Sequence, residues 1–409
     1  MKNNTLKKDF IWNTLGSLIH AFNSLFFLII VTRINGLENS GIFSYGFTIS
    51  NIFLIVASFG GRGYQITDVK GEFSDNKYKN FRYFTTILSL VLFVLLFILF
   101  KYSVYKYLII ILLIIVRGFE SISDVYFGIL QKNHKLYLVG ISLFFKNLLA
   151  LITFIITDYI FKNLYISIIS WGIVNLLFLI FFDILKVKEV SKDKFIIEKD
   201  YKDILKKTLY FFLFNFISVF IINIPRYFID FYLTDEIQGI FGIIVMPATM
   251  TALLTQFILQ PYAVKLSEHN KKDKSKFIKS VKKLFMYTII ISIICITLAY
   301  FFGIPVLNLI YNLNLNDYKY YLLLVMIGSS FYALNNLLNL IYTIKRKTKY
   351  QFIIYLVSIV LSLILSYFLI TKYELLGGVI SYLSIMFIIF ILYIMRLNKT
   401  LKNSQKEFF

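Results

Sequence analysis

The chain contains a single cysteine, Cys295, which lies inside an apolar stretch. One thiol cannot build a disulfide framework or a thiolate metal site, so neither is expected. The three histidines, His20, His134 and His269, are widely separated and give no metal-ligand pattern. The motifs H-E-x-x-H and G-x-S-x-G are absent, as is a Gly-rich phosphate loop with lysine. We therefore predict no metal, no cofactor and no catalytic residues, and we predict that the chain is not an enzyme.

Charge is also scarce, since only 16% of the 409 residues are charged and 58% are hydrophobic. A soluble domain of this length could not bury so much apolar surface, so the sequence predicts an integral membrane protein. The net charge of +21 would suit nucleic acid, but the lysines lie in loops between apolar runs and not on one basic face. No nucleic acid partner is expected.

Apolar runs long enough to cross a bilayer, which takes about 20 residues, follow one another along the whole chain. We count about twelve, and we predict an all-α fold from them. The runs are 10–33, 41–60, 83–101, 107–131, 136–157, 164–185, 208–231, 238–260, 284–304, 320–344, 350–371 and 376–396. They divide into an N-terminal six-helix bundle (1–190), a cytoplasmic linker (191–207) and a C-terminal six-helix bundle (208–409).

The basic residues alternate along the chain. Of the 43, 34 lie before the first run, after the even-numbered runs or at the C-terminus, and six lie in loops after odd-numbered runs. Because cytoplasmic loops carry the excess of lysine and arginine, both termini are predicted to be cytoplasmic. Six helices per half give both halves the same orientation, which makes a parallel internal repeat. A short repeated pattern supports the internal repeat, because an arginine and a short loop precede G-I-F at 41–43 and again at 239–241.

Three basic residues lie within the runs: Arg117, Lys146 and Arg226. Arg117 is ten residues from the outer end of its run, about 15 Å deep in a core of about 30 Å, and Lys146 lies at a similar depth. Ionisable residues at that depth indicate function more often than structure, so a cationic site is predicted. The alternative is that Arg117 pairs with Glu120 or Asp124 on the same helical face, and that Lys146 pairs with another carboxylate, so that these charges only lock the bundle.

Other polar residues in the runs leave two interpretations open. Arg226 and Asp230 are four apart and could form an interfacial pair, while Arg33 at the end of a run could be an anchor. His20 shares a helical face with Asn23 and is either a proton site or a hydrogen-bonded core histidine. Asparagines within the runs are expected to hydrogen-bond between helices first and to sugar hydroxyls second. They are Asn147, Asn175, Asn215, Asn223, Asn335, Asn336 and Asn339.

Four strings carry a resemblance to a known family. They are F-I-W-N-T-L-G-S-L (10–18), V-T-R-I-N-G-L-E-N-S-G-I-F-S (31–44), F-G-G-R-G-Y-Q-I-T-D (59–68) and the segment from N-I-P-R-Y-F-I-D to Q-G-I-F-G-I-I-V-M-P-A-T-M (223–250). The chain resembles bacterial polysaccharide flippases. These are the O-antigen and capsule repeat-unit translocases of the multidrug/oligosaccharidyl-lipid/polysaccharide exporter superfamily. The topology matches throughout, and the specific strings cover about a third of the chain.

The resemblance implies alternating access in the bacterial cytoplasmic (inner) membrane around a central cationic cavity. The usual substrate is undecaprenyl pyrophosphate carrying an oligosaccharide, and membrane lipids are partners; an association with polysaccharide polymerase machinery is left open. A pyrophosphate needs cations, so the predicted substrate-binding residues are Arg117 and Lys146 near the midplane, with Arg33 and Arg226 at the outer mouth.

A second group of residues is predicted to act in gating or coupling. Arg62, Gln65 and Asp68 match the family string at the cytoplasmic end of the second span, which suits a gate or a loop-structuring role. Acidic residues and the histidine complete the group, and the acidic residues of the fourth span argue against a purely cationic cavity. They are Glu120, Asp124, Asp230 and His20.

Several other functions stay open. A multidrug or cation antiporter of the same superfamily is the main alternative, although its cavity should be lined by carboxylates and apolar groups. A peptidoglycan-precursor flippase would typically have more than twelve spans. A membrane polymerase or ligase usually needs a sizeable aqueous loop, whereas every external loop here is short. A nonenzymatic scaffold protein is also possible, but charged residues within the membrane-spanning runs are unusual for one.

Overall fold

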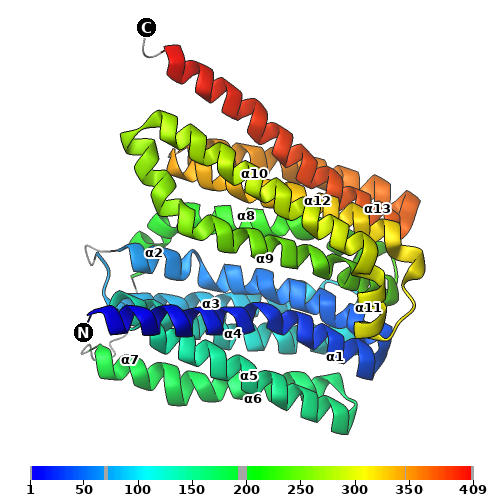
Figure 1. Ribbon diagram of the computed structural model, residues 1–409. Helices are drawn as coiled ribbons and strands as arrows, with labels where there is room; N and C mark the ends of the chain where they lie inside the picture. Colours follow the sequence, from blue (N-terminus) through cyan, green and yellow to red (C-terminus); the bar gives the residue numbers. More distant parts are fainter. Residues whose placement is uncertain (1, 69–71, 192–199, 346, 407–409) are drawn as a thin grey trace. The chain divides into compact units, whose positions relative to one another are not determined.

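The computed structural model describes residues 2–68, 72–191, 200–345 and 347–406. These residues form helices and turns and contain no strand, so the predicted all-α class is confirmed. The chain divides into two compact units, Met1–Val219 and Phe220–Phe409 (Figure 1). The predicted linker 191–207 falls largely on residues 192–199, which lie outside the described part of the chain.

The first unit is built from eight helical elements and the beginning of a ninth. They are α1 (Lys2–Ser58), α2 (Gly61–Thr67), α3 (Asp75–Ile98), α4 (Val104–Lys132), α5 (Leu136–Phe161), α6 (Leu164–Phe178), a π turn (Leu179–Asp183), α7 (Ile184–Val190) and α8 (Lys202–Tyr232). Within α1 only Gly36 departs from helical geometry, with φ +85°. That angle is easy only for glycine, so the chain bends there in one residue. The short loop expected between Arg33 and Gly41 is therefore wrong.

The core of the first unit joins both segments of α1 to α5 and α6. The Phe27 ring lies 4.7 Å from Phe154 and 4.5 Å from Trp171, measured between ring centroids, and Phe43 lies 6.2 Å from Phe154. Phe27, Phe43 and Phe154 are fully buried. Such aromatic contacts add to the burial of large apolar surfaces. They fix α1 against α5, the two helices that carry His20 and Lys146.

The second unit continues from α8 through long helices. They are α9 (Asp235–Lys272), α10 (Lys274–Leu298) with a π turn (Ala299–Gly303) into α11 (Ile304–Tyr311), a 3-10 turn (Asn316–Tyr318), α12 (Lys319–Ile344) and α13 (Thr348–Lys406). α13 is broken at Glu374, which has φ +49°. Asn339 donates to the Tyr355 hydroxyl at 2.6 Å and accepts from Tyr393. Asn335 donates to the Met386 carbonyl at 2.9 Å. These two asparagines therefore hydrogen-bond between helices, as expected.

Nine helices of the described residues are long and apolar enough to cross a membrane. The chain is a multi-pass membrane protein. Each of the long helices α1 and α13 contributes one uninterrupted stretch to that number despite its bend. α4 is not among the nine, and it carries Arg117, Glu120 and Asp124 along its length.

Candidate functional site

The first unit contains a cavity of about 590 Å³. Five of the residues predicted to form a site line it, namely His20, Arg62, Glu120, Asp124 and Lys146. They come from α1, α2, α4 and α5. Helices far apart in the sequence therefore bring charged groups to one cavity. Whether these residues act on a substrate stays a prediction.

Lys146 is held on the cavity wall by a buried carboxylate. Its Nζ lies 3.8 Å from Oδ2 of Asp183, and the two side chains are 3% and 0% exposed. The other carboxylate oxygen accepts a hydrogen bond of 2.6 Å from the Ser142 hydroxyl. The Nζ also lies 5.0 Å from the centroid of the Phe127 ring. The sequence analysis left open that Lys146 pairs with another carboxylate, and that carboxylate is Asp183. The sequence analysis did not name Asp183, although it is the one charged residue in the apolar run 164–185.

Arg117 pairs with Glu120, one turn along α4. Its guanidinium lies 4.6 Å from the centroid of the Phe47 ring and 5.7 Å from that of Trp171. Glu120 lines the cavity, and Arg117 is not among the described residues that do. The arginine therefore contacts a residue of the cavity wall without lining the cavity, and its predicted part in substrate binding stays a prediction.

His20 is hydrogen-bonded and also faces the cavity. Its Nδ1 lies 3.3 Å from Oδ1 of Asn147, and the Asn23 amide donates to the same oxygen at 2.9 Å. This matches the hydrogen-bonded interpretation, while the exposed ring lines the cavity. The contact leaves the predicted coupling role of His20 open.

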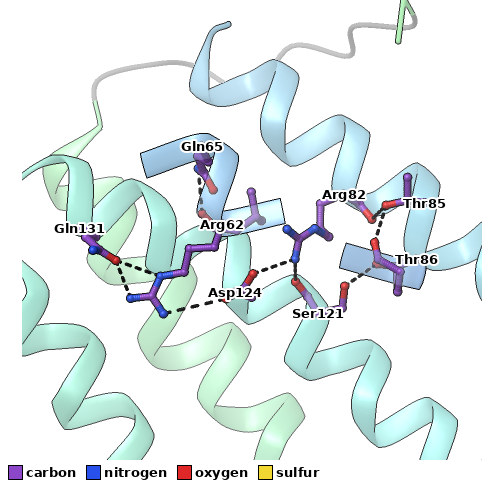
Figure 2. A network of polar contacts seen from close by, with 10 residues as sticks. Arg62, Gln65, Arg82, Thr85, Thr86, Ser121, Asp124 and Gln131 are labelled. Carbon is purple, nitrogen blue, oxygen red and sulfur yellow. Dashed lines mark hydrogen bonds and ion pairs between the residues drawn. The ribbon is translucent and has the colours of Figure 1, made fainter. Parts of the chain in front are cut away.

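A polar network at one end of the cavity is organised by Asp124 (Figure 2). Its carboxylate lies 3.2 Å from Nη1 of Arg82 and 4.0 Å from Nη1 of Arg62. Arg82 also donates to the Ser121 carbonyl at 2.7 Å. Arg62 donates from Nε and Nη2 to the side-chain oxygen of Gln131, at 3.0 and 2.7 Å. One carboxylate therefore ties α2 and α3 to α4 (Figure 2).

Arg82 is a functional candidate that sequence reasoning missed. The third span was predicted to begin at residue 83, but α3 begins at Asp75, so Arg82 lies two turns inside the helix and is 3% exposed. The helix start carries a usable signal. Ser74 accepts a hydrogen bond of 3.0 Å from the amide of Lys77, the pattern of a serine N-cap.

Residues 59–68, which include α2, pack against this network. A Cβ at Gly61 would lie 2.1 Å from Nη2 of Arg82, so any other residue there would force the arginine to move. Gln65 is buried and donates to the Val125 carbonyl at 3.2 Å. A Cβ at Gly128 would lie 2.0 Å from the side-chain oxygen of Gln65. These contacts support a structural part for Arg62 and Gln65 at the end of the span.

Asp68 organises the segment after α2. Its carboxylate accepts hydrogen bonds from the amides of Glu72 at 2.9 Å and Phe73 at 3.2 Å, and from the Tyr78 hydroxyl at 3.0 Å. Burial acts to raise the pKa of Asp68, but the hydrogen bonds outweigh it and hold the pKa below the ordinary value of 3.8.

Asp68 is expected to make stability depend on pH in the acid range. A lowered pKa contributes stability that is present above the ordinary carboxyl pKa and is lost as the pH falls through the folded-state value. We expect Asp68→Asn to lower the midpoint of thermal unfolding at pH 7 and to flatten its fall between pH 5 and about pH 2. Unfolding in detergent across this range would measure both; equal acid dependence in the two proteins would contradict the expectation.

The residues predicted at the outer mouth belong to different units. Arg33 lies on α1 of the first unit, three residues before the bend at Gly36. Arg226 and Asp230 lie on α8 in the second unit, where the Arg226 guanidinium is 5.8 Å from the centroid of the Phe241 ring. Gln238 donates to the Arg226 carbonyl at 3.3 Å. A shared outer mouth stays a prediction.

The family profile described as polysaccharide biosynthesis protein matches residues 6–261, which include every residue that lines the cavity. The chain belongs to this family. Capsular polysaccharide biosynthesis protein CapF of Staphylococcus aureus is 25% identical over 393 residues, which are 91% of this chain and 94% of CapF. The resemblance to polysaccharide flippases is therefore confirmed at the level of the family.

Solved structures show the fold of this polysaccharide biosynthesis family member. An inward-facing multidrug resistance MATE family transporter of the MOP superfamily has a TM-score of 0.74 at 12% identity, covering 97% of this chain and 99% of its own. The lipid II flippase MurJ in an inward closed conformation has a TM-score of 0.74 at 15% identity, covering 95% and 87%. The fold is that of MOP-superfamily transporters.

Proposed function

We propose that the protein is a flippase that moves undecaprenyl-pyrophosphate-linked oligosaccharide repeat units from the cytoplasmic to the outer leaflet of the bacterial cytoplasmic membrane. It works by alternating access, without enzymatic chemistry, in surface polysaccharide biosynthesis. The observation that carries the proposal is the cavity of about 590 Å³ lined by Lys146, Arg62 and His20 in a member of a polysaccharide biosynthesis family. A transporter fold supplies the framework in which such a cavity can alternate between the two sides.

The proposal includes twelve spans with both termini in the cytoplasm. Counting α1 and α13 as two helices each, on either side of Gly36 and Glu374, supports this number. The pairs α6–α7 and α10–α11 each count as one span because a π turn joins them without a break. Six spans then precede residues 191–207 and six follow, which is the division into two bundles that the proposal includes.

The headgroup is proposed to bind by exchange of ionic partners. In the described state Lys146 pairs with Asp183, and Arg62 lies near Asp124. A pyrophosphate that enters the cavity offers Lys146 and Arg62 a stronger partner, because phosphate oxygens form charge-assisted hydrogen bonds. Releasing the carboxylates would loosen contacts between helices, so the substrate would favour a different conformation over the described one.

Neutral polar groups on the same wall suit the sugar. Ser17, Ser58 and Asn215 line the cavity beside the charged residues. Hydroxyl and amide groups can donate to and accept from sugar hydroxyls. The cavity therefore offers both kinds of contact that a lipid-linked oligosaccharide headgroup needs.

A cation antiporter is the second candidate. Glu120 and Asp124 line the cavity, and carboxylates suit a cationic substrate. Both, however, have cationic partners within the protein, Arg117 for Glu120 and Arg82 for Asp124. The presence of these cations favours the anionic substrate.

Translocation in liposomes tests the flippase proposal. A short fluorescent lipid-pyrophosphate oligosaccharide is followed from one leaflet to the other for the wild type and for Arg117→Ala. We expect the variant to be about tenfold slower or worse, because Glu120 loses its partner and adds an unbalanced negative charge to the cavity. Lys186→Gln, which removes one member of an exposed pair with Glu189, is the control and should match the wild type.

The other outcomes separate the site from the function. Equal rates for the wild type and Arg117→Ala would keep the flippase and reject Arg117. Movement of a cationic dye by the wild type, with no movement of the lipid-linked oligosaccharide, would reject the flippase in favour of the antiporter.

A further inference from the structure

The second unit has a groove of its own, between the two halves of α13. It has a volume of about 440 Å³. The first half lines it with Tyr350, Ile353, Ile354 and Val357, and the second half with Leu392, Met395 and Arg396. α13 reverses direction at Glu374, so the beginning of one half lies beside the end of the other. None of these residues lines the cavity that holds Lys146.

The body of the groove is apolar and exposed. Ile353 is 46% exposed, Val357 is 44% exposed and Met395 is 60% exposed. In a membrane-spanning helix such side chains contact lipid, and a concave apolar strip fits an acyl chain better than a flat face does. The shape therefore suits a chain of methylene groups.

The mouth of the groove is cationic. The Arg396 guanidinium lies 4.1 Å from the centroid of the Tyr350 ring, and both residues line the groove. Lys345, Lys347 and Lys349 lie within five residues of Tyr350 in the sequence. Between residues 318 and 406 the one acidic residue in the sequence is Glu374. It lies at the bend, 22 residues from Arg396 in the sequence, or about 33 Å along a helix.

We propose that this groove is a binding site for an anionic phospholipid, with its phosphate on Arg396 and one acyl chain along Ile353, Val357 and Met395. Charge complementarity selects an anionic headgroup, since basic residues at a membrane surface attract acidic lipids. Mass action selects a phospholipid over the polyprenyl carrier, because an abundant lipid fills a site of modest affinity. The bound lipid bridges the two halves of α13 and stabilises their packing.

Lipid binding to the purified full chain tests the proposal. Dye-labelled phosphatidylglycerol is titrated into protein in a zwitterionic detergent, and fluorescence anisotropy gives the affinity. We expect phosphatidylglycerol to bind about tenfold more tightly than phosphatidylcholine, and Arg396→Gln to remove that preference. Arg396→Lys keeps the charge but loses the stacking on Tyr350, so it should fall between the two.

Two further variants keep the test decisive. Lys372→Gln removes a cation beside the bend of α13, where it also lies over a tyrosine ring, Tyr373, and should leave binding unchanged. Val357→Trp fills the groove and should weaken phosphatidylglycerol binding while the headgroup site stays intact. The proposal is overturned if Arg396→Gln binds phosphatidylglycerol like the wild type, or if both phospholipids bind equally. Displacement of phosphatidylglycerol by a lower concentration of undecaprenyl phosphate would overturn it in favour of a carrier site.

Discussion

Replacing Asp124 with asparagine is expected to lower the free energy of unfolding by about 3 kcal/mol, because it leaves a buried arginine without its anionic partner. Arg82 is 3% exposed and lies 3.2 Å from the Asp124 carboxylate, which is itself 30% exposed. The arginine keeps its hydrogen bond to the Ser121 carbonyl, so its charge stays in a protein environment that no longer balances it. An SDS unfolding titration of the purified protein would measure the loss.

A matched control separates this effect from any loss of surface charge. Glu72 pairs with Lys207 at 2.5 Å, and both side chains are more than 40% exposed. Because exposed pairs contribute little, Glu72→Gln should change the free energy of unfolding by less than about 1 kcal/mol. If Asp124→Asn were as mild as Glu72→Gln, Asp124 would not hold α3 to α4 as the geometry in Figure 2 indicates.

The same Asp124 network shows why the fold was easier to predict than the site. Long apolar runs and the bias of basic residues need no knowledge of packing, since hydrocarbon thickness alone sets the length of a span. The boundaries were harder. The chain bends at Gly36 without a loop, and α3 begins at Asp75 inside a segment that its polar composition marks as exposed.

Part of the candidate site could be predicted, because charged residues are easily recognised within apolar runs. Arg117, Glu120, Asp124 and Lys146 could be found in this way, but their partners could not all be found. The Arg117–Glu120 pair follows from helical spacing within α4. The Arg82–Asp124 pair depends on how α3 and α4 are rotated against each other, which is set by packing across the whole unit and not by local sequence.

Asp158 illustrates the same limit. It is fully buried on α5, where it accepts hydrogen bonds from Asn35 at 2.7 Å and Ser167 at 2.8 Å. The sequence places it near the end of an apolar run, where an acidic residue ordinarily reaches water. Asp158 is a core residue only because α1 and α6 pack over it. Its burial could therefore not be predicted from its position in the sequence.

Lys146→Met is expected to lower the free energy of unfolding by about 3–5 kcal/mol and to abolish translocation. The variant leaves the Asp183 carboxylate fully buried, with the Ser142 hydroxyl at 2.6 Å as a remaining contact. Loss of transport in this variant alone is ambiguous, since an unstable protein also fails to transport. The double variant Lys146→Met/Asp183→Leu removes both charges at once, and replacing a whole buried pair by apolar side chains is often neutral or stabilising.

In the double variant we therefore expect stability to recover and translocation to stay lost. We expect the SDS unfolding titration to return to within about 1 kcal/mol of the wild type, since the two substitutions are directly coupled. We expect translocation to stay absent, because a methionine cannot bind a pyrophosphate. Asp183→Leu alone is the matched control: Lys146 keeps its charge but loses its partner. If the double variant recovered both stability and translocation, the Lys146–Asp183 pair would only lock the bundle, and the phosphate site would have to be sought at Arg62 or Arg117.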